Sequence, residues 1–115
     1  MDKLNIAFDV DDTLIIPGIA NSTGRDIPNY EVISTYRWFQ KQGHFMIIWS
    51  GGGVGYAEMW AKKLGLSPDN IIEKRKNDTV DIAFDDCDVD LAKVNIKVKR
   101  LNNNIDRSEW NKHEA

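Results

Sequence analysis

Three short apolar runs, each ending at an acidic or hydroxyl residue, constrain the fold of this chain more than any other feature. The runs are residues 4–8 before Asp9, residues 45–49 before Ser50, and residues 80–84 before Asp85. Runs this short and this apolar are typical of buried strands in a parallel sheet. The segments between them are long enough to hold helices, so we predict an α/β fold.

Two segments between these runs have the pattern of helices. Residues 29–42 carry apolar side chains at helical spacing, with Asn29 as a capping residue and Gly43 where a left-handed residue ends a helix. Residues 56–64 repeat the pattern and stop at Gly65. Alternation of strands and helices predicts a parallel sheet with right-handed crossovers. We therefore expect a three-layer, Rossmann-like fold with helices on both faces of the sheet.

The remaining segments complete a single predicted domain, residues 1–115. Residues 14–28 contain two prolines and two glycines among polar residues and are predicted to form a loop. Residues 71–72 are predicted to form a short strand. Apolar residues alternate with asparagine and lysine over residues 94–99, which is typical of a half-exposed edge strand with its cations outward.

The composition excludes several classes of partner. Hydrophobic residues make up 42% of the chain and charged residues 29%, as in ordinary globular proteins. A net charge of -3 gives no broad attraction to nucleic acid or to an anionic membrane. No stretch approaches the length of a membrane span. The single cysteine, Cys87, excludes an internal disulfide, so we expect a cytoplasmic protein.

Carboxylates gather where the predicted strands end. The carboxyl ends of parallel strands share one rim, and ligands bind in the crevice outside it. The acids expected at this rim are Asp9, Asp11, Asp12, Asp85 and Asp86. Carboxylates within ~5 Å of one another repel unless a cation compensates them. Because all the ligands are oxygens, a hard divalent metal ion is expected here, and Mg²⁺ is an ion of this kind that prefers one or two carboxylates together with water and phosphate oxygens.

The same rim is predicted to bind a phosphoryl group. Ser50 offers a hydroxyl, and the glycines after it expose backbone N–H groups that lead into a helix, which is a natural anion site. A lysine from residues 74–76 lies before the third strand and is within reach of the rim. Metal, hydroxyl, amides and ammonium together favour phosphoryl chemistry, in which a carboxylate can attack phosphorus covalently.

These segments resemble the four motifs of the haloacid dehalogenase-like (HAD) superfamily, in the family's order. The motifs are residues 6–14 (an apolar strand and D-x-D-x-T), residues 45–50 (an apolar strand ending in Ser or Thr), Lys76 or alternatively Lys74, and residues 81–86 (an apolar strand ending in an acidic pair). The intervals at 14–28 and 51–70 have no room for a cap domain. The resemblance is therefore to small capless members.

The resemblance implies a Mg²⁺-dependent phosphomonoester hydrolase that forms an aspartyl-phosphate on Asp9. Asp11 would protonate the leaving oxygen and then deprotonate the hydrolytic water. The implied metal ligands are Asp9, Asp11 through its backbone carbonyl, Asp85, and Asp86 nearby or through water. The implied substrate-binding residues are Asp11, Thr13, Ser50, Gly51 and Lys76, with Ser50 and Lys76 also counted as catalytic and Thr13 steadying the loop.

Some features depart from this pattern or leave alternatives open. Position 12 is Asp where glycine is commoner, which adds negative charge beside the site. A catalytically silent binding domain with the same fold is one alternative. A receiver domain, which is phosphorylated on aspartate, is the other, but its phosphorylated Asp would follow a middle strand, where this chain has Ser50. The expected partner is a phosphorylated substrate, and an open site on so small a body is compatible with a homodimer.

Overall fold

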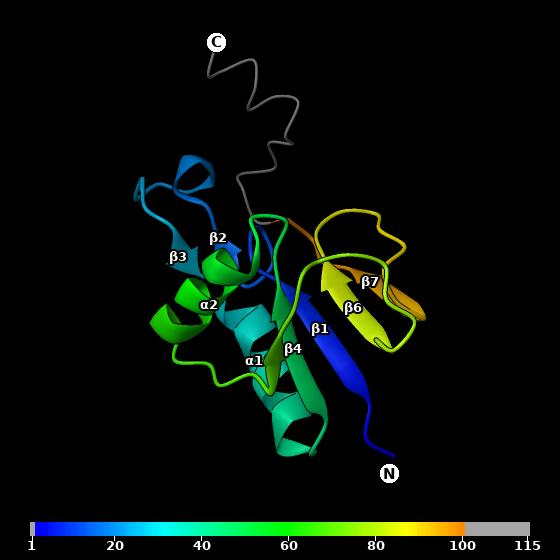
Figure 1. Cartoon of the computed structure of the whole chain (residues 1–115). Helices are drawn as coiled ribbons and strands as arrows, with labels where there is room; N and C mark the ends of the chain where they lie inside the picture. Colours follow the sequence, from blue (N-terminus) through cyan, green and yellow to red (C-terminus); the bar gives the residue numbers. More distant parts are fainter. Residues whose placement is uncertain (1, 101–115) are drawn as a thin grey trace.

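The computed structural model describes residues 2–100, and a parallel sheet of five strands forms the centre of this part of the chain (Figure 1). In spatial order the strands are β5 (Asn70–Ile71), β4 (Phe45–Trp49), β1 (Asn5–Asp9), β6 (Ile82–Asp85) and β7 (Val94–Lys97). Each predicted strand is present, with bounds shifted by at most two residues. The α/β prediction is confirmed. Because β1 lies between β4 and β6, the residues that end these three strands become neighbours.

Both predicted helices are also present. They are α1 (Tyr30–Lys41) and α2 (Val54–Lys63), and α2 begins two residues earlier than expected. Gly43 and Gly65 follow these helices with φ of 88° and 68°, the left-handed conformation that glycine adopts without steric cost. Asn29 precedes α1 as predicted, but its side chain makes no capping hydrogen bond.

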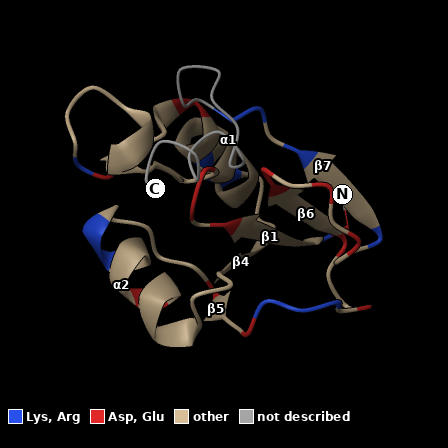
Figure 2. Ribbon diagram, turned by 90° about the horizontal axis from the view of Figure 1, so that it is seen from above, with Lys and Arg blue, Asp and Glu red and all other residues tan. Residues whose placement is uncertain are grey.

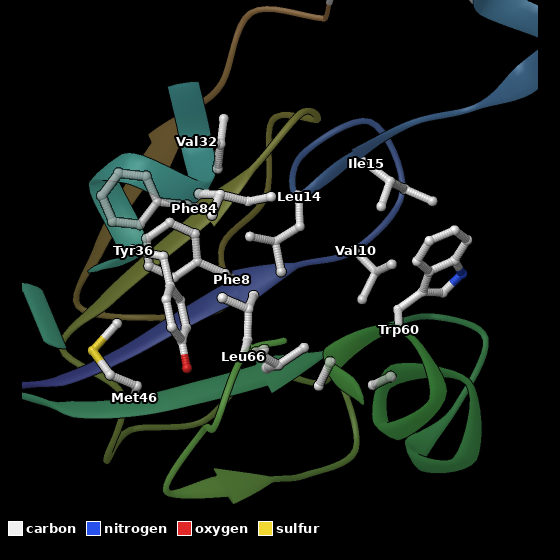
Figure 3. Packing of buried hydrophobic residues seen from close by; sticks show 14 of the residues in the cluster. Phe8, Val10, Leu14, Ile15, Val32, Tyr36, Met46, Trp60, Leu66 and Phe84 are labelled. Carbon is white, nitrogen blue, oxygen red and sulfur yellow. The ribbon is translucent and has the colours of Figure 1, made fainter. Parts of the chain in front are cut away.

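Both helices pack on the same face of the sheet, as the view along the strands shows (Figure 2). The chain moves in one direction from β1 through β4 to β5, and right-handed crossovers in one direction place their helices on one side. Figure 3 shows Phe8 of β1 next to Tyr36 of α1, and Trp60 of α2 belongs to the same apolar cluster. This cluster is the larger part of the core and packs both helices against the sheet.

The opposite face of the sheet is covered by loops. Its apolar cluster contains Ala7, Ile47, Trp49 and Ala83 from the strands, and Val80 from the segment before β6. The chain reaches β6 and β7 through residues 72–81 and 86–93, which are shorter than the dozen or more residues that a helical crossover needs. The helical layer expected on this face is therefore absent from residues 2–100.

The segment predicted as a loop contains a small hairpin, which corrects the prediction for residues 14–28. Strands β2 (Ile15–Ile16) and β3 (Ile27–Pro28) pair antiparallel, and a short 3₁₀ helix, η1 (Gly18–Ala20), follows β2. The Asn21 side chain donates hydrogen bonds to the carbonyls of Ile16, Pro17 and Arg25, which closes the hairpin tip. The hairpin stands beyond the carboxyl ends of the sheet strands (Figure 1).

Strand β7 forms the predicted edge of the sheet, but its apolar side chains are more exposed than expected. Val94 and Ile96 align with Ile82 and Phe84 of β6, and they are 52% and 39% exposed. The nearest helix, α1, leaves this part of the sheet face open. Within residues 2–100, no helix combines the length and the apolar character needed to cross a membrane.

Candidate active site

The candidate site lies at the carboxyl ends of the three central strands. Asp9 is the last residue of β1, Asp85 is the last residue of β6, and Ser50 directly follows β4. All three are buried, with exposed fractions of 5%, 1% and 3%. The parallel register pairs Asp9 with Trp49, so Ser50 lies one residue beyond the Asp9 level. The predicted convergence of these strand ends is confirmed.

Lys74 joins the two buried carboxylates. Its Nζ lies 3.1 Å from Oδ1 of Asp9 and 2.5 Å from Oδ2 of Asp85. Burial alone would lower the pKa of Lys74, but the two carboxylates raise it above its ordinary value. A positive charge thus already sits between Asp9 and Asp85, and the two acids are close enough to share one cation.

Lys76, the preferred candidate from the sequence, lies outside the site. Its side chain is 66% exposed and pairs with Asp90 on the surface, with 3.2 Å between Nζ and Oδ2. Lys74 takes the place predicted for Lys76. Both residues belong to the irregular connection after β5, where no periodicity shows which side chain turns inward.

The folded chain disfavours a negative charge on Asp9. Burial, followed by repulsion from Asp85, raises the pKa of Asp9 to about 7, even though Lys74 opposes the shift. One ammonium group therefore does not compensate the charge of this cluster. A hard divalent cation between Asp9 and Asp85 would supply the missing charge through oxygen ligands, so the residues present fit Mg²⁺.

Asp86 is occupied differently from its neighbour Asp85. Arg100 donates two hydrogen bonds to Oδ2 of Asp86, at 2.7 Å from Nη2 and 3.1 Å from Nε. Ligand atoms of Asp85, Asp86 and Cys87 lie within 4.8 Å of one another, a spacing that a metal ion could bridge. Arg100 engages Asp86, whereas Asp85 shares the Lys74 ammonium group with Asp9.

Asp12 occupies a backbone conformation that is unusual for a residue other than glycine. Its φ is 59°, the left-handed conformation that glycine adopts most readily and that Asp tolerates better than most residues. Its Oδ2 lies 3.9 Å from Nε of Arg100, so a cation offsets the added negative charge. The buried Thr13 hydroxyl makes a long contact of 3.5 Å with Oδ2 of Asp9.

The turn after β4 supports only part of the predicted anion site. The N–H of Gly52 donates to Oγ of Ser50, and the N–H of Gly53 donates to the Ser50 carbonyl, both at 3.0 Å. These two amides are committed to the turn. Gly51 comes directly before these two glycines, and its backbone N–H makes no hydrogen bond within the turn.

Tyr56 is a site residue that the sequence did not reveal. It lies in the first turns of α2, and its hydroxyl donates a 2.7 Å hydrogen bond to Oδ1 of Asp11. Burial, followed by the hydrogen bond to the Asp11 carboxylate, raises the pKa of Tyr56 to about 12. In the sequence Tyr56 belongs to the apolar pattern of its helix, which predicts a core residue. Only its position directly after the glycine cluster signals proximity to the rim.

No family model, curated protein or solved structure matched this chain when it was compared with each of these groups. Function therefore has to be inferred from the residues of the site. The site combines paired buried carboxylates, the half-buried ammonium group of Lys74 and a hydroxyl at the rim of a parallel sheet.

Proposed function

We propose that this chain is a Mg²⁺-dependent phosphatase with a Rossmann-like arrangement of its strands, which hydrolyses phosphomonoesters through an aspartyl-phosphate on Asp9. The observation that carries the proposal is the contact of Asp9 and Asp85 with the same ammonium group, that of Lys74. Acids at two strand ends, Asp11 two residues beyond Asp9, and a cation between the acids are the parts that phosphoryl transfer needs.

The candidate ligands of the ion are Asp9, the backbone carbonyl of Asp11, and Asp85. Asp86 is the weaker candidate for direct contact because Arg100 already engages it. When bound, Mg²⁺ would neutralise charge on the phosphoryl oxygens and lower the repulsion between substrate and carboxylates. This requirement agrees with the raised pKa of Asp9, whose charge is under-compensated by Lys74 alone.

The protein groups supply the covalent and proton-transfer steps. An Asp9 carboxylate oxygen attacks phosphorus, the bond from phosphorus to the leaving oxygen breaks, and Asp11 gives its proton to that oxygen. A water oxygen then attacks the same phosphorus and gives a proton to Asp11, while the bond from phosphorus to Asp9 breaks. The products are an alcohol and inorganic phosphate. Lys74, Ser50 and the Gly51 N–H are the candidates for holding the phosphoryl oxygens.

Hydrolysis of p-nitrophenyl phosphate tests this proposal. The purified chain should release nitrophenol with Mg²⁺, lose the activity with a chelator, and regain it when Mg²⁺ is restored. Asp9→Asn should lower the rate of hydrolysis by at least about 1,000-fold, because an amide cannot act as the nucleophile. The circular dichroism spectrum should stay unchanged. Asp11→Asn should slow breakdown of the intermediate, so that labelled phosphoenzyme accumulates.

A surface variant provides the matched control. Asp90→Asn makes the same chemical change at a side chain that is 77% exposed and pairs with Lys76 on the surface. It should keep the wild-type rate. A folded wild-type chain that releases no product with Mg²⁺, or an Asp9→Asn variant that remains active, would contradict the covalent mechanism. Stable phosphorylation without turnover would instead support the receiver-type alternative.

A further inference from the structure

Asp11 is held by a residue from a distant part of the chain. The Tyr56 hydroxyl donates to Oδ1 of Asp11 at 2.7 Å, although the two residues belong to different connections of the sheet. We infer that Tyr56 is a positioning residue that aims the acid–base proton of Asp11 at the reacting phosphoryl group. The inference rests on the proposed phosphatase function and adds to it a residue outside all four HAD-like motifs.

The Tyr56 ring is itself held against the turn after β4. A Cβ atom built on Gly52 would lie 3.1 Å from Cδ2 and 3.2 Å from Cγ of Tyr56, so the ring packs directly on this glycine. Gly52 in turn donates to Oγ of Ser50. A hydroxyl on a fixed ring is a rigid donor. The turn, the ring and the Asp11 carboxylate therefore form one connected unit.

The hydrogen bond distinguishes the two oxygens of Asp11. Oδ1 accepts from Tyr56 whether Asp11 is a carboxylate or an acid, because the carbonyl oxygen of a carboxylic acid also accepts. The proton is therefore directed to Oδ2. Without the bond, the short Asp11 side chain is free to change rotamer, and its proton loses a fixed direction. Accurate placement of such a proton accounts for a large part of general acid–base catalysis.

The proton then moves along a balanced path. When Asp9 attacks phosphorus, Oδ2 of Asp11 gives its proton to the leaving oxygen as the bond from that oxygen to phosphorus breaks. When water attacks the aspartyl-phosphate, its proton goes to Oδ2 as the bond from phosphorus to Asp9 breaks. Tyr56 keeps its own proton and its bond to Oδ1 in both steps.

The dependence on the leaving group separates this role from simple packing. Tyr56→Phe keeps the ring on Gly52 and removes the hydroxyl that donates to Asp11. Nitrophenolate leaves without much help from an acid, but an alkoxide requires protonation. With Mg²⁺, we expect kcat/KM of Tyr56→Phe to fall by about tenfold for an alkyl phosphate and by less than about threefold for p-nitrophenyl phosphate.

Two controls complete the experiment. Tyr30→Phe removes the hydroxyl of a tyrosine that is 72% exposed. The kcat/KM of this variant should match that of the wild type for both the alkyl phosphate and p-nitrophenyl phosphate. In an Asp11→Ala background, Tyr56→Phe should cause no further loss, because its effect acts through Asp11. An unchanged melting temperature of each variant verifies that the fold is intact.

The outcomes separate this inference from the proposed function. Equal losses for both substrates, or no loss for either, would overturn the role of Tyr56 and leave the phosphatase proposal standing. A further loss in the Asp11→Ala background would overturn it in the same way. A wild-type chain that hydrolyses neither substrate would remove the phosphatase proposal, and this inference with it.

Discussion

The buried Asp9 carboxylate destabilises the metal-free protein when it is charged. Its pKa is raised to about 7 in the folded chain, so between about pH 4 and pH 7 the folded state binds a proton that the unfolded state has lost. Stability that comes from this group is therefore greatest at low pH and falls as the pH rises through 7. At pH 8 the charged form is present, and its burial cost is fully expressed.

Asp9→Asn removes this cost. In the presence of a chelator at pH 8, we expect the variant to be more stable than the wild type by about 2 kcal/mol, because an amide can still accept from Lys74 without carrying a buried charge. Urea unfolding at pH 5 and pH 8 measures the effect. The gain should shrink at pH 5. A variant that is less stable than the wild type at pH 8 would show that Lys74 compensates Asp9 fully.

Lys74 and Lys76 offer a direct comparison of a buried and a surface ion pair. Lys74→Gln leaves Asp9 and Asp85 buried without their shared cation, and we expect a loss of about 3–5 kcal/mol in the metal-free protein. Lys76→Gln breaks an exposed pair and should change stability by less than about 0.5 kcal/mol. Similar unfolding midpoints for the two variants would contradict the assignment of Lys74 to the site.

At the residue scale, the sequence predicts the position of strand-end residues better than that of residues in irregular segments. Asp9, Ser50 and Asp85 were placed correctly because each directly ends an apolar run, and parallel strands bring these ends together. The choice between Lys74 and Lys76 depends on the path of a connection that has no periodicity. The partnership of Tyr56 with Asp11 is a contact between distant segments, which local sequence does not encode.

At the element scale, Asp81 fixes the start of the sheet. Its Oδ2 accepts a 2.7 Å hydrogen bond from the backbone N–H of Asn5, and its Oδ1 lies 3.2 Å from Nζ of Lys93. The backbone hydrogen bond, with further help from Lys93, lowers the pKa of Asp81. A lowered pKa means that this stabilisation is present above the unfolded pKa of about 4 and is lost as the pH falls through the folded value.

Asp81→Asn should therefore destabilise the protein in a pH-dependent way. At pH 7 we expect a loss of about 1 kcal/mol, because a charge-assisted hydrogen bond becomes a neutral one. At pH 3 the variant and the wild type should approach each other in stability. Thermal unfolding at the two pH values measures the change, and Asp90→Asn is the exposed control. A loss that is equal at both pH values would indicate that the charge of Asp81 contributes nothing.

Hydrophobic periodicity was sufficient to find the main elements and insufficient for the smallest one. Helices α1 and α2 and strands β1 and β4 have long enough apolar patterns to be recognised. The hairpin over residues 15–28 pairs two strands of only two residues each, so no alternation can develop. Its stability comes from the hydrogen bonds of Asn21 and from the link between the Gly18 N–H and Asp26, which a pattern search does not detect.

At the scale of the whole molecule, connection length decides which face of the sheet receives helices. The connections that hold α1 and α2 run from β1 outward to β5 and cover one face. The return to β6 and β7 is made by short segments, so loops cover the other face. The alternating pattern predicts the parallel sheet, but it does not predict the direction in which each connection moves across it. This explains why the fold class was predicted correctly while the second helical layer was not found in residues 2–100.

The arrangement of the whole molecule also predicts how a bound ion would act on stability. Asp9 and Asp85 end two neighbouring strands that are remote in sequence, so an ion held by both joins the halves of the sheet. At an Mg²⁺ concentration about ten times the dissociation constant, binding should stabilise the folded chain by about 1.4 kcal/mol and raise its melting temperature by roughly 6–10 °C. Asp85→Asn should abolish this increase, whereas Asp90→Asn should retain it. If Asp85→Asn retained the full increase, the ion would have to bind elsewhere, and the two strand ends would not share it.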